Sequence, residues 1–176
     1  MVDFPVRIID TRQVTWALGF AVLAGAAVRD AGGSADEIEE AIRAAAACQS
    51  IIFTVESLEY LHRGGRIGNA RLLLGSALSI KPILELHEGV VTSVDNVRTR
   101  KRALETLVKT AADRAAGRKV ERLAVIHGAA EQEAQEVLEA AAGKFNPQET
   151  RFSYGCMAIG VHTGPGVVGL VVDWSA

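Results

Sequence analysis

The chain has 176 residues, of which 49% are hydrophobic and 23% charged, so it is long enough to enclose one hydrophobic core. Its net charge of −2 at pH 7 gives no reason to expect a nucleic-acid binder, which needs a basic surface. The two cysteines, Cys48 and Cys156, have no Cys-x-x-Cys spacing, which predicts a reduced cytoplasmic protein and no zinc site.

The first segment with a clear pattern is the uncharged run VTWALGFAVLAGAAV at 14–28. It is too short to span a bilayer comfortably, so we predict no membrane span. Its small residues would also suit a signal-peptide cleavage site, and that alternative stays open. However, Asp3 and Asp10 precede the run, and an acidic leader is unusual for a signal peptide. We therefore favour a buried helix over 12–29.

The rest of the chain alternates between helical and extended patterns. Apolar residues at helical spacing predict helices over 36–48, 101–116 and 130–142, the first of them preceded by a Ser34–Glu37 capping box. Short apolar runs predict strands at 51–55, 123–127, 151–155 and 167–174, and 81–97 reads as a hairpin turning at Glu88-Gly89. This order predicts one α/β domain, residues 1–176, built on a mixed sheet with flanking helices.

The first stretch that could carry chemistry is the turn Arg63-Gly64-Gly65-Arg66, which places two cations around a flexible backbone. Asn69 then resembles the N-cap of a helix over 70–78. Free N–H groups, a helix dipole and guanidinium groups together favour an anion. The alternative is a glycine helix cap flanked by two solvated arginines, and spacing alone favours that alternative.

The second stretch is AIGVHTGPGVVGL, where His162 and Thr163 lie between glycines in an otherwise strand-like apolar run. Pro165 fixes a turn, and Gly164 and Gly166 relax the backbone around it. Both polar side chains can donate hydrogen bonds to an anion at the end of a sheet. The alternative is a structural histidine bonded to a backbone carbonyl, with glycines that only form a corner.

Several common catalytic and cofactor patterns do not occur in the sequence. There is no phosphate-binding GxxxxGK[ST] loop, no GxGxxG at the start of a helix, no GxSxG and no metal-ligand spacing. We therefore predict no catalytic residue, no metal and no cofactor, and interpret the chain as a non-enzyme. His127 at the end of a strand is expected to be structural, and His62 and His87 to lie on the surface.

Four segments, taken together and in order, resemble the DegV family. They are IIDTRQVTWALGFAV, SLEYLHRGGRIGNARLLLGSALSIKPIL, VDNVRTRKRAL and GVHTGPGVVGL, and they span nearly the whole chain. The resemblance implies a fatty-acid-binding protein of two α/β domains, with the carboxylate at the domain junction and the acyl chain buried. It also implies that the protein presents the fatty acid to a separate kinase, which forms an acyl phosphate.

The resemblance also implies roles for individual residues. His162 corresponds to a donor to the fatty-acid carboxylate, with Thr163 beside it, and Arg63 and Arg66 correspond to charged residues near the pocket mouth or partner surface. From the apolar pattern alone we expect the acyl chain to contact Leu72, Leu73, Leu78, Ile80 and Ile83.

The chain departs from the family in its length. Family members carry an N-terminal domain of about a hundred residues, with Ser/Thr-rich loops that also bind the carboxylate. We therefore expect this chain to correspond to the C-terminal domain and to hold at most half of the head-group site. Two other functions remain open: a binder or enzyme for a small phosphorylated metabolite that uses the glycine-rich turns as an anion cradle, and a truncated interaction domain that binds nothing.

Overall fold

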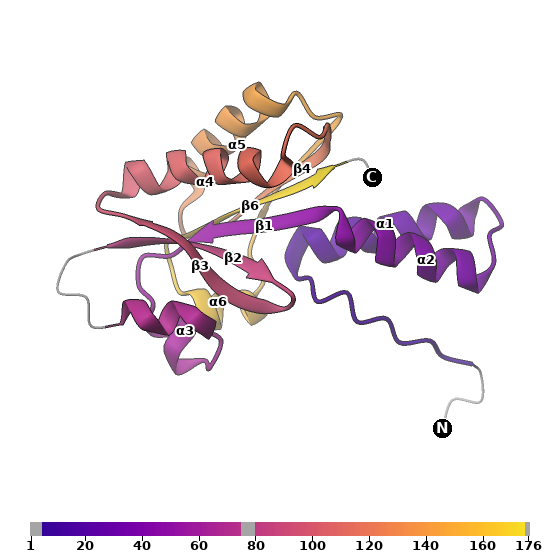
Figure 1. Ribbon diagram of the computed structural model, residues 1–176, viewed down its shortest axis with the longest axis horizontal. Coiled ribbons are helices and arrows are strands. Elements are labelled where there is room, and N and C mark those ends of the chain that lie inside the picture. Colours follow the sequence, from indigo (N-terminus) through magenta and orange to yellow (C-terminus); the bar gives the residue numbers. More distant parts are fainter. Residues whose placement is uncertain (1–4, 75–79, 175–176) are drawn as a thin grey trace.

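The computed structural model describes residues 5–74 and 80–174, and within them six strands form one mixed sheet (Figure 1). The strand order is β3-β2-β1-β6-β4-β5, and only β4 and β5 are parallel neighbours. The strands are β1 (Gln49–Thr54), β2 (Lys81–His87), β3 (Val90–Val97), β4 (Val120–Gly128), β5 (Glu149–Tyr154) and β6 (Val167–Trp174). The predicted mixed sheet is confirmed.

The helices are distributed over both faces of this sheet. They are α1 (Thr15–Asp30), α2 (Ala35–Ala47), α3 (Glu59–Arg63), a 3-10 helix η1 (Gly68–Leu73), α4 (Arg100–Ala115), α5 (Glu131–Phe145) and α6 (Met157–Thr163). α4 and α5 cover one face, and α3 and α6 lie on the other (Figure 1). No helix in the described ranges combines the length and apolar character that crossing a bilayer requires.

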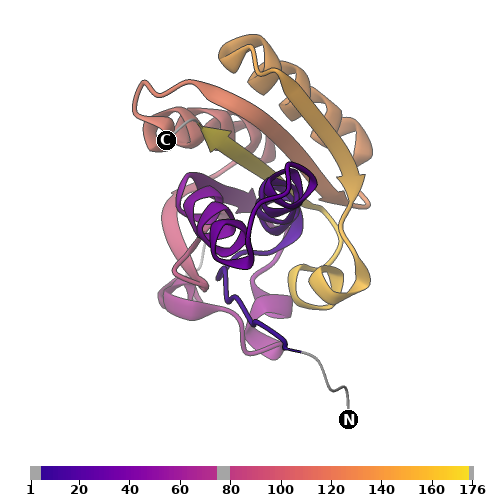
Figure 2. The ribbon, with the colours of Figure 1, turned by 90° about the vertical axis from the view of Figure 1, so that its right-hand side faces the viewer.

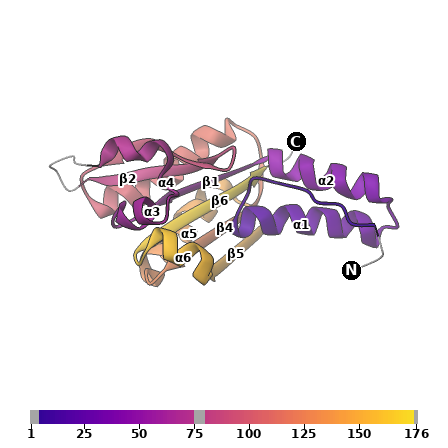
Figure 3. The ribbon, with the colours of Figure 1, turned by 90° about the horizontal axis from the view of Figure 1, so that it is seen from below.

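α1 and α2 form an antiparallel pair that extends beyond one end of the sheet (Figures 1 and 3). Figure 2, which looks along this pair, shows the two helices side by side. Gly25 of α1 brings the helices together, because a β-carbon there would lie 2.7 Å from Ile42 Cγ1. The N-terminal segment before α1 runs back along the pair, and Arg7 contacts Asp36 of α2 at 2.5 Å.

Two hydrophobic cores hold the layers together, one on each face of the sheet. The first packs α4 and α5 against residues such as Ile52 and Leu170. The second packs α1, α3 and η1 against the opposite face, through residues such as Ile51, Phe53 and Val171. Successive residues of β1 thus enter different cores, as the two-residue period of a strand requires.

Two local predictions are confirmed in detail. Ser34 Oγ accepts from the N–H of Glu37, and the Glu37 carboxylate accepts from the N–H of Ser34, which is the complete capping box. The hairpin turns at Glu88 and Gly89, with φ of 50° and 76°. Both central residues are left-handed, as a two-residue turn that matches the twist of the strands requires.

Three sequence predictions need correction. α1 is buried on one side only, and Leu18, Val22 and Leu23 on its other side are exposed. The first part of AIGVHTGPGVVGL, which is strand-like in sequence, forms helix α6 and ends where Gly164 adopts a φ of 72°, whereas the predicted strand at 167–174 is confirmed as β6. Asn69 is not a helix N-cap; it lies within η1, and its side chain accepts from the N–H of Ser93 at 2.8 Å.

Candidate functional site

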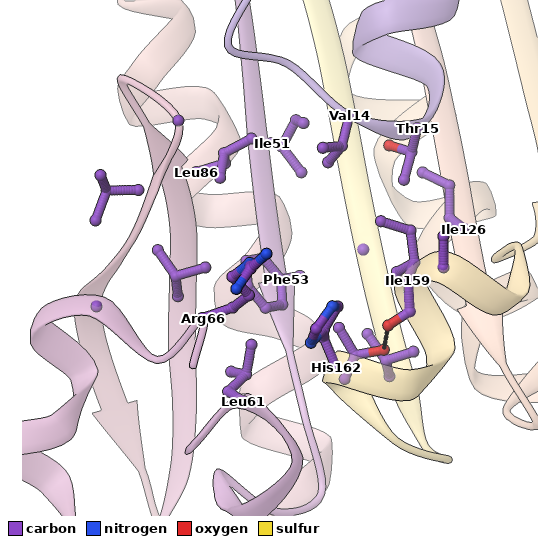
Figure 4. A pocket seen from close by; sticks show the side chains of 18 of the residues that line it. Val14, Thr15, Ile51, Phe53, Leu61, Arg66, Leu86, Ile126, Ile159 and His162 are labelled. Atoms are coloured by element: carbon purple, nitrogen blue, oxygen red, sulfur yellow. Dashed lines mark hydrogen bonds between the residues drawn. The ribbon is translucent and has the colours of Figure 1, made fainter. Parts of the chain in front are cut away.

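A pocket of about 570 Å³ lies on the sheet face that carries α3 and α6 (Figure 4). Its floor consists of apolar side chains from several strands that are far apart in the sequence. Polar groups enter it from α6, from the turn after α3 and from the start of α1. The lining residues are Val14, Thr15, Ile51, Phe53, Leu61, Gly65, Arg66, Gly68, Leu86, Gly89, Val90, Val91, Ile126, Ala158, Ile159, His162, Thr163, Val167 and Gly169.

His162 lies in the last turn of α6, with its imidazole at one end of the pocket (Figure 4). Its Nδ1 atom is buried and has no hydrogen-bond partner among the described residues. This nitrogen faces Gly64, at the end of α3, where a β-carbon would lie 2.1 Å from it. The imidazole thus lines the pocket while its Nδ1 bonds no backbone carbonyl within the described residues, and the binding role of His162 stays a prediction.

The two glycine-rich turns interlock at this site. The imidazole of His162 packs directly on Gly64, where a β-carbon would overlap with Nδ1. In return, the ring of Tyr60 packs on Gly164, where a β-carbon would overlap with the aromatic carbons. The glycines of the two motifs therefore provide close contact between α3 and α6, which fixes the position of His162.

Thr163 is buried beside His162, but its hydroxyl already has a partner. The side chain donates to the carbonyl oxygen of Ile159 one turn earlier in α6, at 3.0 Å. A hydroxyl has a single proton, so Thr163 cannot donate to a ligand while it keeps this bond. The expected donor role of Thr163 thus does not match this geometry, and its hydroxyl stabilises the turn that carries His162.

The structure separates the two arginines of the Arg63–Arg66 turn. Arg66 lines the pocket, its Nη1 donates to the carbonyl of Gly64 at 3.2 Å, and it forms no ion pair within the described residues (Figure 4). Arg63 does not line the pocket; its exposed side chain pairs with Glu59 at 2.5 Å. Only Arg66 is therefore placed to attract an anion into the pocket.

The acyl-chain lining expected from the sequence does not coincide with this pocket. Leu72 is 89% exposed on η1, and neither the half-buried Leu73 nor Ile80 reaches the pocket. Ile83 is buried in the core on the opposite face, because the alternation of β2 directs Leu84 and Leu86 to the pocket side instead. Leu78 lies outside the described residues.

The comparisons with known proteins agree with this architecture. A family model described as "Uncharacterised protein, DegV family" matches residues 1–173. The chain belongs to the DegV family. A DegV domain-containing protein of Streptomyces coelicolor is 43% identical over 170 residues, which cover 96% of this chain and 60% of the relative.

Solved structures of DegV proteins share the fold. A fatty-acid-binding DegV protein of Thermus thermophilus superposes with a TM-score of 0.89 at 29% identity, covering 96% of this chain and 61% of that one. DegV of Bacillus subtilis, described as a fatty acid binding protein, gives 0.79 at 29% identity, with 95% and 60% covered. The chain thus spans about three-fifths of the length of these DegV relatives.

The remaining histidines of this DegV-family chain lie outside the pocket. His127 is fully buried on the α5 side of the sheet, where its Nδ1 accepts from the N–H of Ala130 at 3.4 Å and its ring contacts Phe152 and Tyr154. His62 and His87 are exposed, as expected. Within the described ranges, His, Cys, Asp and Glu form no group of three suited to a metal ion.

Proposed function

We propose that this chain binds a long-chain fatty acid in the pocket and presents its carboxylate to a separate kinase, without catalysing a reaction itself. The observation that carries this proposal is the imidazole of His162 at one end of an otherwise apolar pocket. An amphiphile with one anionic end and a long hydrocarbon chain has the chemistry that such a pocket complements.

The hydrocarbon supplies most of the binding free energy in this proposal. Each buried CH₂ group contributes about 0.8 kcal/mol, so a chain of about sixteen carbons gains roughly 12 kcal/mol before costs. Ordering the chain and losing translational freedom offset a large part of this gain. Phe53, Ile126 and Leu86, which belong to three different strands, are among the side chains that would contact it.

The carboxylate cannot enter an apolar pocket without partners. We assign it to the imidazole of His162 and to the guanidinium of Arg66, which both line the pocket. Charge-assisted hydrogen bonds of this kind are about twice as strong as neutral ones. Thr163 acts indirectly, since its hydroxyl holds the last turn of α6.

The relatives support the ligand class and suggest what completes the site. Two DegV proteins with 29% identity to this chain are described as fatty-acid binding, and both are longer. We propose that their unmatched part corresponds to an N-terminal domain whose Ser/Thr-rich loops contact the second carboxylate oxygen. The kinase that we propose uses ATP, so we place the complex in the cytoplasm, where Cys48 and Cys156 stay reduced.

The apolar lining argues against a phosphorylated metabolite. A phosphate group carries close to two negative charges and requires several donors at once. At this end of the pocket His162 and Arg66 supply the side-chain donors, and the floor beneath them is hydrocarbon. A small polar ligand would leave this floor in contact with water.

The proposal is tested by titrating the delipidated chain with octanoate, laurate and palmitate, and with short-chain phosphate monoesters. We expect affinity to rise steeply with acyl length, because each added CH₂ is buried. His162→Ala should weaken palmitate binding about tenfold or more, because it removes a charge-assisted hydrogen bond. His62→Ala, on the exposed side of α3, is the matched control.

Two results would overturn the proposal. Affinity that is independent of acyl length, together with binding of phosphate monoesters, would favour the anion-cradle function. A folded chain whose melting temperature and calorimetric signal are unchanged by every fatty acid would favour a domain that binds no lipid.

A further inference from the structure

A second polar group lies at the other end of the pocket from His162. Thr15, at the start of α1, lines this end together with Val14, and Figure 4 shows both residues opposite the imidazole. The hydroxyl oxygen of Thr15 is buried and has no hydrogen-bond partner among the described residues. The neighbouring wall is apolar and includes Ile51 and Ile126.

The backbone holds Thr15 in a conformation that its side chain disfavours. Its φ is 52°, in the left-handed region that a β-branched residue rarely occupies. Such conformations persist only where the surroundings impose them, and they concentrate at ligand-binding positions. A pocket residue that combines an unfavourable backbone with an unpaired buried hydroxyl therefore calls for a functional explanation.

Contacts on both sides of Thr15 hold its position. Arg12 pairs with Glu88 in the β2–β3 turn, and the Nε2 of Gln13 donates to the carbonyl of Ala46 in α2 at 3.2 Å. On the other side, Trp16 Nε1 donates to Ser153 Oγ on β5 at 2.9 Å. The hydroxyl of Thr15 thus has a defined place relative to the strands that form the pocket floor.

An unsubstituted alkyl chain leaves this hydroxyl unsatisfied. A buried hydroxyl without a partner is unfavourable, whereas an oxygen atom on the ligand would supply an acceptor and, if it is itself a hydroxyl, a donor. Sites that hydrogen-bond a ligand hydroxyl also discriminate strongly against analogues that lack it. The hydroxyl of Thr15 can therefore distinguish oxygenated acyl chains from plain ones.

We propose that Thr15 is a specificity-determining residue and that the pocket prefers long-chain fatty acids with a hydroxyl or keto oxygen in the half of the chain remote from the carboxylate. This inference rests on the proposed function, since it takes the carboxylate to lie beside His162. Arg66 and His162 bind the carboxylate, and Thr15 forms a hydrogen bond with an oxygen atom on the acyl chain.

The test compares three ligands on the delipidated chain: palmitate, palmitate with a hydroxyl at its methyl end, and palmitate with a hydroxyl next to the carboxylate. We expect the first hydroxylated ligand to bind about tenfold more tightly than palmitate, the effect of one well-formed buried hydrogen bond. The second should show no such gain. Dissociation constants are measured for the wild type, Thr15→Val and Thr15→Ser, with melting temperatures as a check on folding.

The variants separate a hydrogen bond from a packing effect. Thr15→Val keeps the volume and β-branching, so it should bind palmitate as tightly as the wild type and lose the preference. Thr15→Ser keeps the hydroxyl and should retain the preference. Two outcomes overturn this inference but leave the proposed function intact, provided that palmitate binds. In the first, wild type and Thr15→Val show the same preference for the ligand hydroxylated at its methyl end. In the second, neither protein shows that preference. Failure of all three ligands to bind overturns both.

Discussion

Gly64 shows how a single position can be restricted by space alone. Its φ of −77° is open to any residue, so the backbone does not require glycine there. The restriction comes from His162, whose imidazole occupies the volume of the missing side chain. In the sequence, this glycine is interpreted as a flexible turn or a helix cap, whereas in the fold the imidazole that we propose as a carboxylate donor packs against it.

Gly64→Ala should therefore displace the imidazole and weaken palmitate binding about tenfold, with a stability loss of about 1–3 kcal/mol from overpacking. Gly160→Ala in α6 is the matched control, since a β-carbon there meets nothing within 4 Å. It should raise stability slightly through helix propensity and leave binding unchanged. Urea unfolding measures the change in stability, and palmitate titration measures the change in affinity. If Gly64→Ala binds palmitate as tightly as the wild type, the position of the His162 imidazole on Gly64 is not needed for binding.

At the scale of an element, α2 is stabilised at its start by a charged capping group. The pKa of Glu37 is lowered from its usual value of 4.5, first by the hydrogen bond from the N–H of Ser34 and then by the Ser34 hydroxyl. The ionised form is thus favoured by folding, and its contribution is complete above the unfolded pKa. It is lost as the pH falls through the lower, folded pKa.

Glu37→Gln should consequently be less stable than the wild type near neutral pH, with a difference that shrinks as the pH falls from about 5 to about 3. In a Ser34→Ala background the same substitution should have a smaller effect, because the carboxylate then accepts from the backbone N–H of residue 34 but no longer from the Ser34 hydroxyl. Urea unfolding of the four proteins across this range gives the measurement. A difference that stays constant with pH would show that the Glu37 charge contributes nothing.

At the scale of the whole molecule, one arginine connects the helical layer to the turn beyond α6. Arg100 begins α4 with its side chain 15% exposed, and its Nη2 donates to Glu133 of α5 at 2.7 Å. The same nitrogen donates to the carbonyl of Gly166, in the His162–Gly166 turn, at 2.6 Å. Glu56, which follows β1, lies 3.8 Å away and also pairs with Lys81.

Arg100→Met should destabilise the protein by about 2 kcal/mol, because it leaves the Glu133 carboxylate and a backbone carbonyl without their shared donor. Arg100→Lys should recover little of this loss, since an ammonium cannot reproduce the planar fork of a guanidinium. Lys101→Met, at the exposed neighbouring position, serves as the control. Equal stability of wild type and Arg100→Lys in urea unfolding would contradict a role for this fork.

The sequence alone determined much of the local structure. Periodicity identified α2, α4, α5 and most strands, because a helix or strand with one exposed side leaves a visible repeat of polar and apolar residues. It also drew attention to His162 and Thr163, since polar residues between glycines are unusual in an apolar run, and to Arg63 and Arg66 as two cations around a glycine turn. The sequence pattern did not predict α6, because this helix has only seven residues and its apolar sequence also resembles a strand.

The tertiary structure alone decided which residues form the pocket. β1 is buried along its whole length, so its hydrophobicity does not reveal that Ile51 and Phe53 face the pocket while Ile52 enters the other core. Thr15 gave no signal, because its significance depends on a missing hydrogen bond. A binding pocket brings together residues that are distant in the chain, and the free energy that selects those contacts comes from burial, which local patterns do not encode.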